Sequence, residues 1–372
     1  LFPYTTLFRS DAFEAILAEH RGAPAVAVDT EFMRRNTFYP QAALLQLCFT
    51  DHAWLVDPLA LEDTSSLVGL FDDPATTKVL HSASEDLEVF DHWLGALPAP
   101  LFDTQRAAGL LDRGFGTGYR GVVEQTFGVT LDKGETRSDW LRRPLSESQC
   151  RYAALDVAYL LPLYERLRAD AEAAGKLPWI LEEGAVACAG AGSRNPAYHL
   201  RVKSAWKLDR RQLAALERLC AWREEEAASR NKPRSWILDD KLCLAIARAM
   251  PSNSAALAAA GEVPPAVLRR CGAALLDCIA GARALPEEAL PAPLPAPLDS
   301  EERRRLKALK GRVRTLAGAA SVAPEMLLAG RDLELLLREA RGLAISEPAS
   351  WQGWRRALAI EPLRAALAEG AL

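Results

Sequence analysis

Apolar positions along this chain follow both strand and helical periods. Strand patterns occur only in the N-terminal part, whereas the C-terminal part has helical patterns alone. Ala25–Val28 is a short apolar run of β-forming residues, which predicts a buried strand that leads into Asp29. Further strands are predicted at 43–49, 53–56 and 78–80, and helices at 11–20, 85–94, 119–127 and 147–168. Strands followed by alternating helices indicate an α/β domain with a mixed β-sheet.

The C-terminal part of the chain has apolar residues at helical spacing. Residues 209–282 predict several helices with short connectors, and residues 299–372 predict a second helical module rich in Leu and Ala. Between them, PEEALPAPLPAP at 286–297 predicts an extended, semi-rigid linker. A chain of 372 residues is long enough for two or three domains, so we expect one α/β domain followed by two all-helical modules.

Charge is distributed unevenly along the chain. Residues 11–190 contain 15 Lys and Arg against 28 Asp and Glu, a net of −13, whereas residues 201–285 contain 15 against 9, a net of +6. An acidic region can hold cations and a basic region can contact a polyanion. A solvated face with uneven charge remains the alternative for the basic region.

Cysteine usage and the start of the chain limit the compartment. The seven cysteines are odd in number and form no CxxC pair, so we expect reduced thiols in a cytoplasmic protein and no zinc site. No apolar run reaches the roughly 18–20 residues of a membrane span. Residues 1–10 contain neither Met nor a secretory cleavage signal, and we expect them to be non-native or disordered.

Acidic residues on two predicted elements are the first candidates for chemistry. Asp29 and Glu31 lie two positions apart on a predicted strand and so point to the same face, whereas Thr30 between them points away. Asp86 lies at the start of a predicted helix, where an acid suits the helix dipole and Ser84 is a candidate cap. Either feature alone occurs by chance in many proteins.

A third element adds a tyrosine and a fourth carboxylate. Tyr152 and Asp156 lie four positions apart in a predicted helix and share one of its faces. Four carboxylates that converge raise each other's pKa steeply unless cations neutralise them. Two divalent metals provide that charge, and oxygen ligands suit Mg²⁺ or Mn²⁺ better than Zn²⁺. Such a site suits phosphodiester hydrolysis.

The complete set resembles a known group of nucleases. VAVDTEF, HSASEDLEVF and YAALDVAYLLPLY resemble the three motifs of the DEDD superfamily of 3′–5′ exonucleases, and the tyrosine marks its DEDDy branch. FYPQAALLQL, FDTQRAAGLL and VTLDKGETRSDWLRRPLSESQC are similar to the bacterial ribonuclease D family, and LAALERLCAWREEEAASRNKPRSWILDDKLCLAIARAMP resembles an HRDC domain. The resemblance implies an RNase H-like exonuclease domain at 11–190, HRDC domains at 205–285 and 299–372, and a linker at 286–298.

The residues and the resemblance suggest the same roles. Asp29, Glu31 and Asp156 are expected to ligate one ion, and Asp29 is best placed to reach a second ion together with Asp86. Tyr152 is expected to orient the attacking water rather than take its proton, because the reference pKa of tyrosine is about 10.

Further residues are expected to contact the substrate. Phe32, Met33 and Gln46 follow or face the acidic pair, and Lys133 and Arg137 are candidates to neutralise phosphates. A core position is the alternative for Phe32, and a surface ion pair is the alternative for the two cations.

The resemblance implies a metal-dependent 3′–5′ exoribonuclease that trims tRNA precursors and other small structured RNAs and releases nucleoside 5′-monophosphates. RNA is the expected partner, through the active site and the HRDC domains, in which Trp222 and Trp236 are expected in the core. We expect a cytoplasmic monomer that does not contact membranes. A non-catalytic RNA-binding protein and a 3′–5′ DNA exonuclease remain alternatives, because no residue can be shown to read a 2′-hydroxyl.

Overall fold

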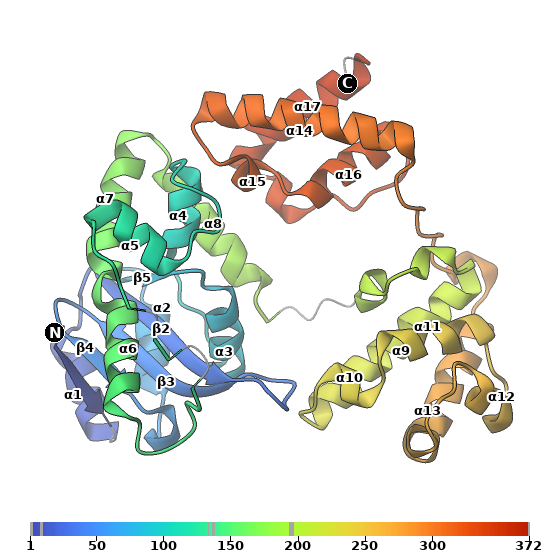
Figure 1. Cartoon of the computed structure of the whole chain (residues 1–372), viewed down its shortest axis with the longest axis horizontal. Helices are drawn as coiled ribbons and strands as arrows, with labels where there is room; N and C mark the ends of the chain where they lie inside the picture. The colour runs from blue at the N-terminus through green and yellow to red at the C-terminus, as the bar shows by residue number, and fades with distance from the viewer. Residues whose placement is uncertain (1–2, 8–9, 133, 136–137, 193–196, 371–372) are drawn as a thin grey trace. The chain divides into compact units, whose positions relative to one another are not determined.

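The computed structural model describes residues 3–7, 10–132, 134–135, 138–192 and 197–370. The chain forms two compact units (Figure 1). Unit 1 comprises residues 1–33, 41–193 and 299–372, and unit 2 comprises residues 34–40 and 194–298. The C-terminal helices therefore belong to the same unit as the β-sheet, although the Pro-rich linker and the first helical module separate them from it in the sequence.

A mixed sheet organises unit 1, as the sequence predicts. Its six described strands have the order β1-β4-β3-β2-β5-β6. Strands β2, β3 and β4 form an antiparallel meander, whereas β1 runs parallel to β4, and β5 and β6 continue parallel to β2. The bounds are Tyr4–Leu7 (β1), Ala25–Met33 (β2), Gln41–Cys48 (β3), Ala53–Val56 (β4), Thr77–Leu80 (β5) and Leu101–Asp103 (β6).

The first strand corrects one expectation. Residues 4–7 pair with β4, which rules against disorder in this stretch, while the alternative that residues 1–10 are non-native stays a prediction. An edge strand needs only main-chain hydrogen bonds to a neighbour, and YTTL contains β-branched and aromatic residues that favour this conformation.

Alternation along β2 gives the sheet two differently covered faces. Val26 and Val28 pack in a buried cluster with Phe13 and Phe90, which come from α1 and α3. On the opposite face, β2 contacts α6 and α7. Because side chains alternate along a strand, Asp29 points toward α6 and its neighbours point toward α3. The helices around the sheet are Ser10–Glu19 (α1), Ser65–Asp72 (α2), Ser84–Leu94 (α3), Thr104–Leu110 (α4), Tyr119–Phe127 (α5), Glu147–Ala158 (α6), Leu160–Ala173 (α7) and Leu177–Gly190 (α8).

One predicted helix is interrupted. The apolar spacing predicts a continuous helix over 147–168, but the structure has α6 and α7 separated at Tyr159. Pro162 lies in the first turn of α7, where its missing amide and its ring cannot continue the hydrogen bonding of α6. The prediction of one helix is therefore wrong, because apolar periodicity alone does not register such a break.

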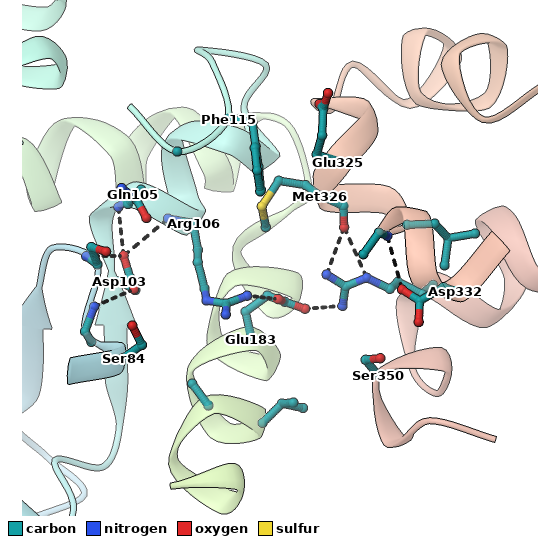
Figure 2. Close-up of a pocket in the computed structure, with 18 of the residues that line it drawn as sticks. Ser84, Asp103, Gln105, Arg106, Phe115, Glu183, Glu325, Met326, Asp332 and Ser350 are labelled. Atoms are coloured by element: carbon teal, nitrogen blue, oxygen red, sulfur yellow. Dashed lines mark hydrogen bonds and ion pairs between the residues drawn. The ribbon is translucent and has the colours of Figure 1, made fainter. Parts of the chain in front are cut away.

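One buried ion pair and several hydrogen bonds hold the C-terminal helices of unit 1 against the helices that cover the sheet. Glu183 of α8 accepts from Arg106 of α4 at 2.8 Å and also pairs with the buried Arg355, whose Nε donates to the carbonyl of Met326 at 3.1 Å (Figure 2). Lys176 donates to carbonyls on both sides of the same contact. The C-terminal helices are Ser300–Ala320 (α14), Pro324–Leu327 (α15), Gly330–Ala340 (α16) and Glu361–Ala368 (α17), with a π-helical turn at Arg356–Ile360.

Unit 2 is a small helical bundle. Its helices are Arg210–Ser229 (α9), Arg234–Ile237 (α10), Asp240–Ala249 (α11), Ser254–Ala259 (α12) and Pro265–Arg283 (α13). The segment 34–40 also belongs to this unit: Phe38 packs on Ala227 and Ile237, and Asn231 accepts hydrogen bonds from the amides of Phe38 and Tyr39.

The aromatic residues of unit 2 differ in burial. Trp222 packs partly buried against the helical core. Trp236 is 55% exposed, so the prediction that it lies in the core is wrong. The four-residue helix α10 carries it, and so short a helix gives no apolar period from which to predict the exposed side. Within the described part of the chain, no helix is both long enough and apolar enough to cross a bilayer.

Candidate active site

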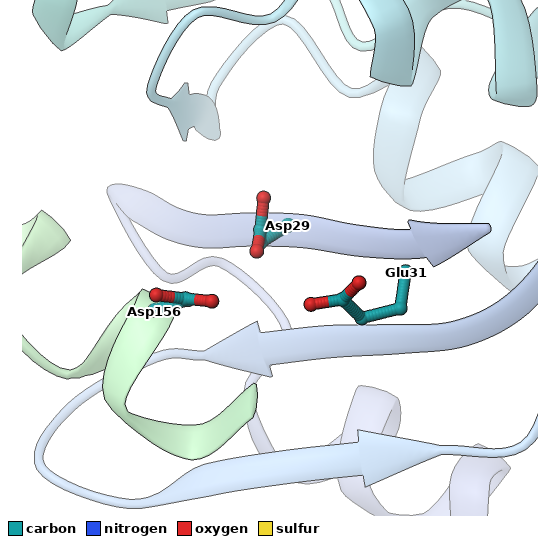
Figure 3. Close-up of side chains that lie close together, drawn as sticks. All are labelled: Asp29, Glu31 and Asp156. Carbon is teal, nitrogen blue, oxygen red and sulfur yellow. The ribbon is translucent and has the colours of Figure 1, made fainter. Parts of the chain in front are cut away.

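Three of the four predicted carboxylates meet at one point beside the sheet. Asp29 and Glu31 extend from β2, and Asp156 extends from α6 (Figure 3). One carboxylate oxygen of each lies within 4.8 Å of the others. The pairing of β2 with β3 changes register between Glu31 and Phe32, and such an irregularity turns side chains at the end of a strand.

Asp86 lies outside this group of three. It comes from the start of α3, where the hydroxyl of Thr30 donates to its Oδ1 at 2.5 Å, and among the carboxylates its charge acts most strongly on the pKa of Asp29. Thr30 points away from the carboxylate pair as the alternation predicts, but the sequence does not reveal that it holds the fourth acid. A hydroxyl between two acids on a strand is the only signal, because the partner is 56 positions away.

The start of α3 is fixed by a residue that sequence reasoning missed. Asp103, at the end of β6, accepts from the amides of Ser82 at 3.1 Å and Ala83 at 3.0 Å, and it also caps α4. Ser84 makes no cap, because α3 begins at this residue and Ala83 occupies the cap position. The suggested Ser84 cap is therefore wrong, since a cap must precede the helix.

Burial raises the pKa values of all four carboxyl groups, and for Asp29 and Glu31 the charges of the other carboxylates raise them further. For Asp29 the pKa lies well above its ordinary value, first through burial and then through the charges of Asp86, Asp156 and Glu31. Burial and the same kind of repulsion raise the pKa of Glu31 to about 9. Burial raises the pKa of Asp86 to about 7 and that of Asp156 to about 6. These oxygens fit a divalent cation, which supplies the positive charge that the described neighbours do not fully provide.

Tyr152 is held next to this group. It hydrogen-bonds to Asp156, one helical turn away, and this bond and the nearby Arg120 hold the pKa of Asp156 below the value that burial alone would give. The ring contacts two further side chains, the ring of Trp140 at 6.0 Å and the guanidinium of Arg120 at 5.6 Å. The backbone of Gly134 approaches the tyrosine ring closely, because a Cβ at that position would collide with it. Arg120 and Gly134 carry no sequence signal for this role.

The predicted substrate contacts differ in position. Phe32 and Met33 are partly exposed at the end of β2. Gln46 is fully buried opposite Asp29 on β3, and its side-chain amide has no hydrogen-bond partner among the described residues. Because directly paired residues of antiparallel strands share a face, this amide lies on the side of the carboxylates. Lys133 and Arg137 lie outside the described residues.

Comparison with known proteins gives a consistent result over the whole chain. Residues 4–172 match the 3′–5′ exonuclease family, and residues 212–279 match the HRDC domain family. Ribonuclease D of Pseudomonas paraeruginosa is 43% identical over 342 residues, which cover 91% of this chain and 90% of that protein. Ribonuclease D of Escherichia coli K12 is 38% identical over 375 residues, which cover 98% of this chain and 99% of that protein.

The fold agrees with the sequence comparison. A crystal structure of Escherichia coli RNase D, described as an exoribonuclease involved in structured RNA processing, has a TM-score of 0.89 and 37% identity to this chain. The match covers 98% of this chain and 99% of that one. The predicted α/β exonuclease domain followed by HRDC helices is thereby confirmed, while the individual domain boundaries remain a prediction.

Proposed function

The chain belongs to the ribonuclease D family, and we propose that it trims the 3′ ends of tRNA precursors and other small structured RNAs as a metal-dependent 3′–5′ exoribonuclease that releases nucleoside 5′-monophosphates. The observation that carries this proposal is the meeting of Asp29, Glu31 and Asp156, with Tyr152 bonded to the last of them. This arrangement occurs in a chain that matches ribonucleases D over more than nine tenths of its length.

We propose that Asp29, Glu31, Asp86 and Asp156 hold two Mg²⁺ or Mn²⁺ ions. The support is chemical: the donors are all carboxylate oxygens, and their raised pKa values indicate a negative potential that a hard cation would relieve. Bound there, the ions would lower the pKa of a water to supply hydroxide and would stabilise the leaving 3′-oxygen.

Tyr152 is proposed to keep its own proton and to orient the attacking water. Burial and the charges of Asp156 and Glu31 raise the pKa of Tyr152, so its hydroxyl stays protonated at neutral pH. A protonated phenol can orient a water by a hydrogen bond but cannot take its proton, as the sequence predicts for Tyr152. Phe32 and Met33 are proposed to contact the terminal nucleotide, because they follow Glu31 directly and remain partly exposed.

Unit 2 is proposed to hold the RNA body. Its residues match an HRDC domain, and the region 201–285 carries a net charge of +6. Two exposed indoles have a lysine ammonium nearby: Trp236 with Lys232 at 6.0 Å, and Trp206, 37% exposed, with Lys207 at 5.4 Å. Indole faces stack on bases and ammonium groups neutralise phosphates, which is how single-stranded nucleic acid is held without sequence preference. The cytoplasmic, monomeric state expected from the sequence remains part of this proposal.

Labelled oligonucleotides test the reaction. RNA and DNA carrying a label at the 3′ or the 5′ end are incubated with Mg²⁺, Mn²⁺ or EDTA, and products are resolved by length. We expect stepwise shortening from the 3′ end of RNA only when a divalent metal is present. Degradation that persists in EDTA or starts at the 5′ end contradicts the mechanism, and equal rates on DNA favour the DNA exonuclease.

A matched pair of variants tests the site. Asp29→Asn removes one charge from the three-carboxylate group and is expected to lower single-turnover activity by about three orders of magnitude or more, with the circular dichroism spectrum unchanged. Asp51→Asn removes an exposed charge from the turn between β3 and β4 and is expected to leave activity unchanged. Comparable activity in the two variants would reject the ligand role of Asp29 and favour a non-catalytic RNA-binding protein.

A further inference from the structure

The junction of α6 and α7 contains a second irregularity besides Pro162. In a continuous helix, the amide of Tyr159 would donate to the carbonyl of Leu155, four residues earlier. In this structure the amide of Tyr159 donates to the hydroxyl of Tyr119 at 2.9 Å, and it also faces the carbonyl of Val157. The same Tyr119 hydroxyl donates to the carbonyl of Leu155 at 3.2 Å. A side-chain hydroxyl is therefore inserted into the helical hydrogen-bond ladder, which is a recognised cause of a helix kink.

The inserted side chain is firmly held. Tyr119 is the first residue of α5, and its ring packs edge-on against His81 at 5.7 Å. His81 is itself fixed at both ring nitrogens, by Thr104 at 2.8 Å and by the carbonyl of Thr117 at 3.1 Å. Because α5 and the end of β5 carry these residues, the hydroxyl is positioned by elements outside the helix that it enters.

The opened turn contains the metal-ligand candidate of α6. Leu155 and Tyr159 bracket Asp156, so the two hydrogen bonds of Tyr119 fix the backbone immediately before Asp156 and three residues after it. Closing the ordinary helical bond between these residues would tighten the turn and rotate the Cα–Cβ bond of Asp156. The direction of that bond determines whether its carboxylate reaches the oxygens of Asp29 and Glu31.

We propose that Tyr119 is a positioning residue, which opens the helical turn around Asp156 with its hydroxyl and thereby aims this carboxylate at the metal site. This inference rests on the proposed function, because it assigns Asp156 to a metal. It adds to the site a residue whose hydroxyl bonds the backbone of α6 and acts on Asp156 through that backbone.

Metal binding without RNA provides the direct test. Mn²⁺ is titrated into the full-length protein, and the free ion is measured by electron paramagnetic resonance. Tyr119→Phe removes one oxygen and keeps the ring, and we expect its Mn²⁺ affinity to fall about tenfold, the usual size for loss of a group that orients a ligand. With RNA, kcat at limiting Mn²⁺ should fall while KM for RNA stays unchanged, and additional Mn²⁺ should restore kcat.

Two further proteins separate positioning from general stability. Tyr164→Phe removes another buried tyrosine hydroxyl, one that accepts from Arg168 at 3.3 Å on α7, and is expected to bind Mn²⁺ as the parent does. Replacing Tyr119 by 4-aminophenylalanine restores a group that can donate and accept, and is expected to recover most of the affinity. Equal Mn²⁺ affinity in the parent and Tyr119→Phe overturns the inference, and so does equal loss in Tyr164→Phe.

Hydrogen exchange supplies a measurement that requires no variant. The amide of Tyr159 should exchange slowly in the parent, because the hydroxyl of Tyr119 accepts from it, and exchange at the rate of an open amide overturns the inference. Failure of the parent itself to bind Mn²⁺ would instead reject the proposed function. The two failures are therefore distinguishable.

Discussion

Metal binding should expel protons from this site, and Glu31 allows the effect to be quantified. Its carboxyl lies on β2 within the three-carboxylate group, where burial and the charges of Asp156 and Asp86 raise its pKa to about 9. The metal-free protein therefore holds a proton on Glu31 at neutral pH. A carboxylate must lose that proton to ligate a cation, so Mn²⁺ binding and proton release are linked.

The size of the linkage follows from the shifted pKa. At pH 7 the carboxyl lies about two units below its pKa, which weakens the apparent Mn²⁺ affinity about 100-fold, or about 2.7 kcal/mol at 1.36 kcal/mol per unit. The affinity should thus rise about tenfold for each pH unit between about pH 6 and about pH 9, and the raised pKa of Asp29 steepens this rise.

Stability without metal should have the opposite dependence on pH. Because the folded-state pKa of Glu31 is raised above 4.5, its contribution is fully present below about pH 4.5 and is lost as the pH rises through about 9. The metal-free protein should therefore unfold more easily toward alkaline pH, whereas saturating Mn²⁺ should remove this dependence, since a bound cation favours the ionised form.

Calorimetry in two buffers of different ionisation enthalpy measures the released protons directly. We expect about one proton from Glu31 per Mn²⁺-loaded site at about pH 7, and about one fewer in Glu31→Gln, which cannot ionise. Glu62→Gln changes an exposed carboxyl and should release as many protons as the parent. A Mn²⁺ affinity that does not change with pH, or equal proton release in the parent and Glu31→Gln, would refute the reasoning.

Three other predictions concern separate parts of the molecule. Glu183→Gln leaves the buried Arg355 without its counter-charge and should lower the free energy of unfolding of unit 1, measured in urea, by about 3 kcal/mol. Arg106→Gln, at a side chain that is 41% exposed, should change this free energy by less than about 1 kcal/mol. Similar effects of the two substitutions would contradict this prediction. Tyr152→Phe should slow single-turnover trimming roughly 10- to 100-fold with Mn²⁺ affinity unchanged, and a parallel loss of affinity would argue against an orienting role. Trp236→Ala should weaken binding of a long RNA by about 1–3 kcal/mol in fluorescence anisotropy while a dinucleotide is cleaved at the parent rate, and unchanged RNA affinity would exclude stacking at this indole.

The local patterns that predicted correctly are those in which a short segment determines its own structure. The apolar run before Asp29 forms the interior of β2, and the helix expected at 119–127 has those bounds in the structure. The predicted helix over 147–168 was wrong because two features interrupt it: Pro162 in the helix itself, and Tyr119, which lies 36 positions before Leu155. Its inserted hydroxyl changes the backbone without changing the apolar spacing that the prediction uses.

In the candidate site too, some features follow from local spacing and others depend on tertiary packing. The spacing of Asp29 and Glu31 places both on one face of a strand, whatever the rest of the chain does. That Asp86 stands outside the group of three and accepts from Thr30 depends on how α3 packs against the sheet. Likewise, Glu183 pairs with Arg355, 172 positions away, so the sequence predicts separate modules where the structure has one unit.

The sequence by itself determined the kinds of chemical groups in this protein, the faces on which neighbouring residues lie and the family to which the chain belongs. The chemical groups and the faces follow from residue identity and from strand and helix periods, which are local properties, whereas the family follows from the resemblance of the motifs. Only the tertiary structure decided how far apart the carboxylates lie, how strongly burial raises their pKa values and which side chain enters α6. Those quantities depend on the packing of segments distant in the chain, and no local period carries that information.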